Sequence, residues 1–339
     1  MQPIFEIDVN RRTPKYLQIA HSITKAIKQG KFKRGDRILS INELSNEYML
    51  SRDTVQKAYD MLEKEKILQA VRGKGFFINR TDIVMPYRIL LVFNKLSNYK
   101  KMIYDSFVAS LGNKATVDLK IHHSSVKLLK EITEASAGEY DYYVIMPHFY
   151  EQQEEAIKIL SGIPSEKLLL LDKIIPDRFV GSPAVYQDFE KDIIDALETG
   201  LKTIRKYQSL FFVHPRLVPF PFEIVNGFRQ FCRQYSFEQK VLGEIGLDHD
   251  VQKGQVYIVI EESDLVNLIK IIQRKKFIIG KDVGIISYNE TPLKEILLGG
   301  IATISTDHTL MGVTAAEMII NQKSERIKNP FTLIPRPSL

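Results

Sequence analysis

The chain has 339 residues, 44% of them hydrophobic, so it is long enough for two domains that each bury a core. One cysteine, Cys232, excludes a disulfide framework and a cysteine-rich zinc site, and we expect it to be a packed core thiol. Residues 1–80 hold 16 Lys and Arg against 9 Asp and Glu, whereas the other 259 residues hold 31 against 32. All of the net charge of +6 therefore lies in the first quarter of the chain. No export signal is visible, and no run reaches the roughly 18 apolar residues of a membrane span, so a cytoplasmic location without a membrane partner is expected.

The first predicted element is a helix that begins at Thr13-Pro14 and ends at Gly30. Proline suits the first turn of a helix, and glycine is common just after the last. Between them, apolar residues recur at helical spacing and should form a buried stripe: Tyr16, Ile19, Ala20, Ile23 and Ile27.

Two further helices are predicted between Ser40 and Leu62. Ser40 followed by Glu43 is a capping box, so a helix should open there, with Ile41, Leu44 and Tyr48 on one face. After a tight turn at Met49-Leu50, Ser51 is a good N-cap for the next helix. That helix should bury Val55, Ala58, Tyr59 and Leu62 and leave polar side chains outside in its first two turns. Two helices joined by so short a turn form a helix-turn-helix.

A hairpin follows the helices. Leu68–Val71 and 76–78 read as short strands joined by Arg72-Gly73-Lys74-Gly75, a turn with two cations at its tip. The pattern alone also fits any small helical domain with a surface hairpin. The local positive charge favours a winged helix-turn-helix that binds the phosphates of DNA.

Residues 13–78 resemble the winged helix-turn-helix of the GntR family of bacterial transcription regulators. The matching segments are PKYLQIA at 14–20, GKFKRGDRI at 30–38, SRDTVQKA at 51–58, Leu62-Glu63 and GKGFF at 73–77. Leu39 departs from the family, which usually has proline there; this should loosen the entry turn but not the DNA-reading surface. The residues expected to contact DNA are Ser40, Asn42, Ser51, Arg52, Thr54, Gln56, Lys57, Arg72, Gly73 and Lys74.

The domain organisation expected from these patterns is a DNA-binding domain at 1–79, a short polar linker at 80–87 and a second domain at 88–339. From 88 onward, strands alternate with helices, which indicates an α/β fold of parallel sheets. About 250 residues favour two Rossmann-like lobes around a cleft. The predicted strands are 89–93, 117–121, 142–146, 168–171, 210–213, 239–244, 256–260, 283–287, 301–304 and 331–334. The predicted helices are 100–111, 126–137, 150–160, 188–205, 222–235, 263–275 and 307–321.

This second region resembles the sugar-sensing domain of the LacI/GalR repressors, which has the fold of type I periplasmic binding proteins. The segments that carry the resemblance are LSNY at 96–99, Asp172-Lys173, DFE at 188–190, NGF at 226–228 and VGIISYNETP at 283–292. Two departures stand out. Ile224 occupies a position where many members have a ligand-binding arginine. Only about a dozen residues separate the strands at 239–244 and 256–260, which is barely enough for a crossover helix.

Ligands of such folds bind beyond the carboxyl ends of the strands. Carboxylates, amides and aromatic rings at those ends suit a polyol such as a sugar. The candidate effector-binding residues are Asn98, Tyr99, His148, Asp172, Asp188, Arg216, Phe222, Asn289 and Glu290. For each alone, a helix cap or surface role is at least as common; Asp188 in particular could be only an N-cap. The resemblance implies an effector-binding aspartate at the position of Asn289, where an amide would remove a charge from the pocket.

Neither a metal nor a cofactor is predicted. His122 and His123 are adjacent, and neighbouring residues of a strand point to opposite faces, so they should not bind one ion together. No sequence motif of a metalloprotease, a serine hydrolase or a phosphate-binding loop is present.

The patterns and the resemblance together imply a ligand-responsive transcription regulator, most often a repressor. It would bind double-stranded operator DNA as a homodimer and respond to a small molecule, such as a monosaccharide or a derivative. The layout is similar to that of arabinose repressors. The alternative is a DNA-binding domain fused to an enzyme-like module, which would need a cofactor lysine and a longer chain.

Overall fold

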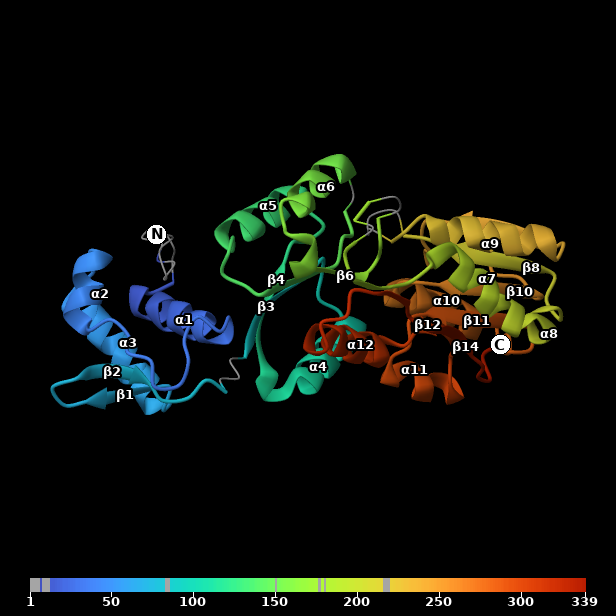
Figure 1. The fold of residues 1–339 in the computed structure, drawn as a ribbon. Helices are drawn as coiled ribbons and strands as arrows, with labels where there is room; N and C mark the ends of the chain where they lie inside the picture. The colour runs from blue at the N-terminus through green and yellow to red at the C-terminus, as the bar shows by residue number, and fades with distance from the viewer. Residues whose placement is uncertain are drawn as a thin grey trace. The chain divides into compact units, whose positions relative to one another are not determined.

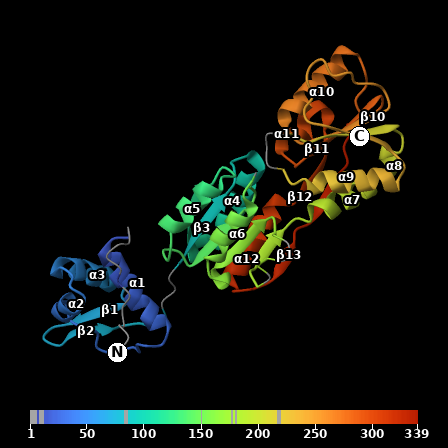
Figure 2. The same ribbon diagram turned by 90° about the horizontal axis from the view of Figure 1, so that it is seen from above.

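The computed structural model describes residues 7, 13–82, 86–149, 151–175, 178–179, 181–215 and 220–339. It divides into two compact units, Met1–Pro86 and Tyr87–Leu339. In Figures 1 and 2 the colour of the first unit runs from blue to cyan, and that of the second unit runs on through green and yellow to red. In the part of the chain that the structure describes, no helix is both long and apolar enough to cross a lipid bilayer.

The first unit contains three helices and a two-stranded antiparallel sheet: α1 (Lys15–Lys28), α2 (Ile41–Glu47), α3 (Arg52–Lys64), β1 (Leu68–Val71) and β2 (Gly75–Ile78). Its core is formed by the residues predicted to face inward on α1 and α3, together with the hairpin residues Leu68 and Ile78. The three helices and the hairpin confirm the predicted winged helix-turn-helix.

Local capping explains why α2 and α3 begin where they do. Ser40 N–H donates to the Glu43 carboxylate at 2.6 Å, and Glu43 N–H donates to Ser40 Oγ at 3.2 Å. Ser51 Oγ accepts the backbone N–H of Thr54 at 3.2 Å. Both caps satisfy amides that have no partner inside the helix. The turn between the helices passes through Met49, whose φ is +50°.

The second unit consists of two lobes, each built around a six-stranded sheet. The sheet of the first lobe has the order β13-β7-β6-β5-β3-β4, and all its neighbouring pairs are parallel. Its elements are β3 (Tyr87–Phe93), α4 (Asn98–Leu111), β4 (Ala115–Ile121), α5 (Val126–Ala135), β5 (Tyr142–Ile145), α6 (Gln153–Ser161), β6 (Leu168–Asp172), β7 (Ala184–Tyr186), α12 (His308–Ile320) and β13 (Arg326–Lys328).

The central strands β3, β5 and β6 of the first lobe are mainly apolar because helices cover both faces of the sheet, whereas the edge strands β4 and β13 carry charged residues. Alternate residues of β3 enter different cores: Leu91 packs in the core that includes α4 and α12, and Leu90 in the core that includes α5 and α6. Figure 1 shows α4 and α12 side by side.

The sheet of the second lobe has the order β14-β12-β11-β10-β8-β9, with β14 antiparallel to β12 and the other pairs parallel. Its elements are α7 (Phe189–Thr199), α8 (Leu201–Ile204), β8 (Ser209–Val213), α9 (Glu223–Gln234), β9 (Glu238–Leu242), β10 (Gln255–Val259), α10 (Glu262–Arg274), β11 (Val283–Tyr288), α11 (Pro292–Ile296), β12 (Ala302–Thr306) and β14 (Phe331–Ile334). Cys232 is buried in this lobe beside Phe231, as predicted.

The predicted α/β architecture with two Rossmann-like lobes is confirmed, and four details differ. The predicted helix at 188–205 is interrupted at Gly200, where a Cβ would lie only 2.4 Å from Leu333 Cδ2. The strands β7 and β13 and the helix α11 were not predicted, because elements of three to five residues show too little periodicity. Between Leu242 and Gln255 there is no helix, in line with the short connection in the sequence.

The chain passes between the lobes at three places: after β7, after β12 and after β13. Asn329, almost fully buried, connects all three segments. Its amide Nδ2 donates to Thr306 Oγ1 at 2.7 Å and to the Asp307 carbonyl at 2.8 Å, and its backbone N–H donates to the Tyr186 carbonyl at 2.7 Å. Nearby, Lys328 of the first lobe pairs with the buried Asp192 of the second at 2.7 Å.

Replacing Asn329 should therefore destabilise the second unit more than replacing an exposed asparagine. Asn329→Ala removes both side-chain hydrogen bonds, so the Thr306 hydroxyl and the Asp307 carbonyl each lose a donor. The free energy of unfolding is therefore expected to fall by about 1–3 kcal/mol. Urea unfolding followed by circular dichroism measures it, with exposed Asn113→Ala as the matched control. Equal stability of the two variants would contradict this role of Asn329.

Candidate functional site

The exposed face of α3 is polar because its opposite face is in the core. Val55, Ala58, Tyr59 and Leu62 are buried. Ser51, Arg52, Gln56 and Lys57 are exposed and Thr54 is half-buried, so the predicted DNA-reading residues share the solvent side of the first two turns. This leaves a row of hydrogen-bond donors at the N-terminal end of the helix.

The side chains on this face differ in how they are held. Gln56 Nε2 donates to Asp60 Oδ1 at 2.6 Å, and the Lys57 ammonium lies 4.3 Å from the centre of the Tyr16 ring. The hydroxyls of Ser51 and Thr54 are 2.7 Å apart. The Arg52 guanidinium forms no hydrogen bond or ion pair with any described residue, so it is the side chain of this row that is free to reach a base edge.

The remaining candidates for DNA contact lie on α2 and on the hairpin. Asn42 is exposed on α2, and Ser40 is half-buried because it caps that helix. Arg72, Gly73 and Lys74 form the exposed turn between β1 and β2, and Gly73 adopts φ +74°, which favours glycine. The first unit thus presents a polar helix and a cationic wing.

In the second unit, one pocket is lined by residues of both lobes and lies at the carboxyl ends of their parallel strands. The cavity itself is small, about 30 Å³, and it is continuous with open solvent. The lining residues are Asn94, Lys95, Tyr99, Lys100, His148, Asp172, Gln187, Phe189, Phe220, Pro221, Ile224, Tyr288, Asn289 and His308. Amides, one carboxylate, imidazoles, hydroxyls and aromatic faces therefore converge at one point.

Asp172 is the only acid among these residues, and it is held on both oxygens. His148 Nε2 lies 2.8 Å from Oδ2, and Gln187 Nε2 donates to Oδ1 at 2.5 Å. Burial alone would raise the pKa of Asp172, but the bond with His148, the nearby Lys100 ammonium and Gln187 hold it well below its usual range. Burial lowers the pKa of His148, although the Asp172 carboxylate acts in the opposite direction. Asp172 is consequently a fixed anion.

Aromatic groups also line the pocket. The rings of Tyr99 and His308 are tilted against each other with centroids 5.0 Å apart. Burial lowers the pKa of His308 to about 4, so its imidazole is neutral at neutral pH. A neutral, partly hydrophobic wall of this kind suits the apolar face of a sugar ring.

Three comparisons with known proteins bear on this arrangement. Residues 15–78 match the family model for bacterial regulatory proteins of the gntR family. Over 110 residues the chain is 30% identical to the HTH-type transcriptional repressor YtrA of Bacillus subtilis, covering 32% of this chain and 82% of that repressor. The chain belongs to the gntR family of bacterial regulatory proteins.

Two further similarities include the second unit. The regulator is 23% identical to the arabinose metabolism transcriptional repressor of Geobacillus stearothermophilus, over 96% of each chain. Its fold is similar to that of the trehalose repressor from Escherichia coli, with a TM-score of 0.61 and 14% identity, over 74% of this chain and 100% of that one. A full-length relative that is a repressor supports a transcription regulator, and the alternative of a fused enzyme module is not favoured.

The pocket of the regulator brings together four of the nine predicted effector-binding residues: Tyr99, His148, Asp172 and Asn289. Asn289 follows β11 with φ +63° and is one of the lining residues. Ile224, the position that departs from the LacI/GalR pattern, is also among the lining residues, and it is fully buried in the core of the second lobe.

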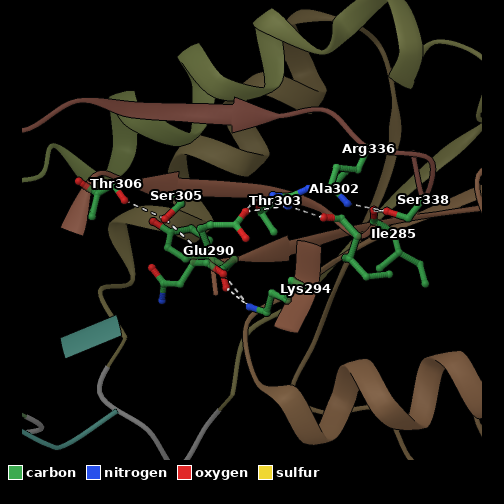
Figure 3. Close-up of polar contacts among 12 residues, drawn as sticks. Ile285, Glu290, Lys294, Ala302, Thr303, Ser305, Thr306, Arg336 and Ser338 are labelled. Atoms are coloured by element: carbon green, nitrogen blue, oxygen red, sulfur yellow. Dashed lines mark hydrogen bonds and ion pairs between the residues drawn. The ribbon is translucent and has the colours of Figure 1, made fainter. Parts of the chain in front are cut away.

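Four other candidates lie outside the pocket lining. Asp188 is the N-cap of α7 and accepts the Lys191 N–H at 3.3 Å, the alternative already noted for it. Figure 3 shows Glu290 turned toward Arg336 and Thr303; the distance to Arg336 Nη1 is 2.7 Å. Phe222 is 56% exposed and Asn98 is exposed at the start of α4. The ninth candidate, Arg216, lies outside the described residues.

Sequence reasoning missed several lining residues. Asn94 and His308 follow β3 and β12 closely, so the strand-end rule could have found them. Gln187 follows β7, which was not predicted. Lys100 lies inside α4, where nothing in the sequence distinguishes it from the exposed Lys101.

The histidine pair does not lie on a strand, contrary to the prediction. His122 and His123 follow β4, and His123 has φ +49°. His122 is buried, with Nε2 2.9 Å from the Met146 carbonyl, whereas His123 is exposed. Among the described residues no group of three or more His, Cys, Asp or Glu could hold a metal ion.

The buried histidines make the stability of the second unit depend on pH. Burial lowers the pKa of both His122 and His308 to about 4, below the value of roughly 6.5 for an unfolded chain. The unfolded chain then binds more protons between these values, so stability is lost as the pH falls from about 6.5 toward 4. We expect the melting temperature of the second unit to fall by several degrees over this range.

His308→Gln should reduce that fall, because the substituted side chain does not titrate. Exposed His123→Gln is the matched control and should follow the wild-type curve. The measurement is a series of thermal unfolding curves from pH 7.5 to 4.5, and identical slopes for His308→Gln and the wild type would contradict the interpretation.

Proposed function

We propose that the regulator is a repressor whose binding to operator DNA is controlled by a small carbohydrate, a monosaccharide or a derivative. The observation that carries the proposal is the pocket between the two lobes, where amides, a fixed carboxylate and aromatic faces converge. Hydroxyl groups of a sugar can donate to Asp172 and pair with Asn94 and Asn289, while Tyr99 covers a ring face. The full-length relative is named as a repressor of arabinose metabolism, which supports the same class of effector.

The proposed contacts with DNA are made by the exposed row on α3 and by the wing. The N-terminal turns of α3 enter the major groove, where Arg52 can reach a guanine edge and Gln56 and Lys57 contact bases or phosphates. Arg72 and Lys74 at the tip of the hairpin contact the backbone or the minor groove. Ser40, Asn42, Ser51, Thr54 and Gly73 complete the proposed set through phosphate contacts.

A homodimer would place two such helices in successive major grooves of a near-palindromic operator. A surface suitable for pairing exists on the second lobe, where Leu293, Ile296 and Leu298 are 58%, 74% and 45% exposed on α11 and the turn that follows it. Ligand binding would favour one degree of lobe closure and thereby one dimer geometry. DNA affinity then changes because the two helices no longer match the operator spacing.

The first test separates base reading from phosphate binding. Arg52→Ala is expected to abolish specific operator binding, because Arg52 is the side chain proposed to read a base. Lys74→Ala is expected to weaken binding to all sequences and to lower the slope of log K against log salt by about 1. Footprinting and salt-dependent titrations measure both effects. Lys64→Ala, at the other end of α3, is the control and should bind as the wild type does. Normal footprints of the Arg52 variant would refute the role of this helix.

The second test concerns the dimer. Ile296→Glu places a charge in the exposed apolar cluster and should shift the protein toward the monomer, since a buried unpaired charge is costly. Sedimentation velocity at several concentrations reports the association state, and Val266→Glu, an exposed apolar position on α10, is the control. An unchanged association constant for Ile296→Glu would place the contact elsewhere.

The third test concerns the effector. A sugar present at about 100 times its dissociation constant should stabilise the second unit by about 2.7 kcal/mol. Thermal shift of the full chain with neutral monosaccharides, sugar phosphates and sugar acids therefore identifies the class. Absence of any shift across all three classes would contradict a carbohydrate effector.

A further inference from the structure

Lys100 is a buried cation in the wall of the pocket. It is 2% exposed, and its ammonium donates to Asn94 Oδ1 and to Met146 Sδ, the latter at 3.1 Å. The amide of Asn94 is itself held by a 3.4 Å contact with Ser124 Oγ. Both partners of the ammonium are uncharged, which is unusual because buried charges are normally paired.

The acids near the pocket are already engaged elsewhere. No carboxylate oxygen of a described residue lies within 4.0 Å of Lys100 Nζ. Asp172 interacts with Lys100 through space, but His148 and Gln187 occupy its two oxygens. Lys95, the other lysine in the lining, lies 3.9 Å from Glu261, outside the lining. The pocket wall therefore contains a desolvated ammonium whose charge is only partly balanced.

Two further polar atoms in the lining lack partners among the described residues. The hydroxyl of Tyr288, a residue 2% exposed, and Oε1 of Gln187 are buried without a hydrogen bond. A hydroxyl can donate to an oxyanion, and an amide oxygen can accept from a sugar hydroxyl. These atoms independently indicate that the pocket is built around a polar ligand.

We propose that the effector is an anionic monosaccharide derivative, a phosphate ester or a sugar acid, whose negative group is bound by the Lys100 ammonium. This rests on the proposed function, because it concerns the effector of the same pocket. Asn94 and Met146 hold Lys100 in place, and the oxyanion supplies the countercharge that the protein does not. The sugar hydroxyls then form hydrogen bonds with Asp172, Gln187 and Asn289.

The protonation state of Lys100 agrees with this assignment. Burial lowers the pKa of Lys100 to about 8, partly opposed by Asp172, which raises it. The ammonium therefore remains mostly protonated at neutral pH.

The test compares matched ligands on the full chain by isothermal titration calorimetry. Glucose, fructose and arabinose are titrated beside their terminal phosphates and beside gluconate, glucuronate and galacturonate, with inorganic phosphate at equal ionic strength as a salt control. We expect at least one phosphate or acid to bind about 10-fold or more tightly than its neutral parent. Tighter binding of the sugar phosphates would identify the effector as a phosphate ester, and tighter binding of the sugar acids would identify it as a carboxylate.

Variants assign the effect to this lysine. Lys100→Met keeps an unbranched side chain one atom shorter than lysine and removes the charge, and should weaken binding of the anionic sugar by about 10- to 100-fold. Lys101→Met is the matched control, because Lys101 is exposed on the same helix and pairs with Asp105. Lys100→Gln provides a second, polar substitution, with the same loss expected, and circular dichroism verifies that each variant is folded.

The outcomes separate this proposal from the function on which it rests. If a neutral sugar binds as tightly as its anionic derivatives, or if Lys100→Met and Lys100→Gln bind the anion as the wild type does, the anionic effector is refuted and a carbohydrate effector stands. If no sugar of either kind binds, the carbohydrate effector itself is refuted. If inorganic phosphate binds as tightly as the sugar phosphates, the pocket is an anion site and not a sugar site.

Discussion

The position of the pocket depends on the connection between the two lobes, and Asn329 is at its centre. Three separate chain segments pass between the lobes. Asn329 lies in one of them, its side-chain amide bonds to the segment after β12, and its backbone N–H bonds to the segment after β7. Three linked segments constrain the relative position of the two lobes more than a single connecting segment would. The strand ends of both sheets can therefore face one ligand from two sides.

The polar groups around the pocket are arranged so that few are left unsatisfied. Asp172 is fixed by His148 and Gln187, and Glu290 is withdrawn into contacts with Arg336 and Thr303 (Figure 3). Burial keeps His308 neutral. The Lys100 ammonium and the Tyr288 hydroxyl are exceptions. No described carboxylate pairs with the ammonium, and no described residue forms a hydrogen bond with the hydroxyl.

In the DNA-binding unit, by contrast, interactions between residues close in sequence determine where the helices begin and which side chains are exposed. The capping box at Ser40 and the N-cap at Ser51 set the start of two helices, and the short turn through Met49 sets their connection. The core then requires Val55, Ala58 and Tyr59 to face inward, which leaves Arg52 and its neighbours outside. The proposed reading surface is thus a consequence of caps and helical periodicity.

The sequence by itself determined the helix-turn-helix, its wing, the alternation of strands and helices and four of the pocket residues. Caps, glycine turns and apolar periodicity act over a few residues and can be read directly. Tertiary structure alone decided that Lys100 is buried while Lys101 is exposed, and that Asp188 and Glu290 serve as a cap and an ion-pair partner. Neither the three-residue strands β7 and β13 nor the place of Gln187 beside Asp172 could be predicted. These features depend on contacts between segments far apart in the chain, and such contacts cannot be predicted from patterns within a few residues.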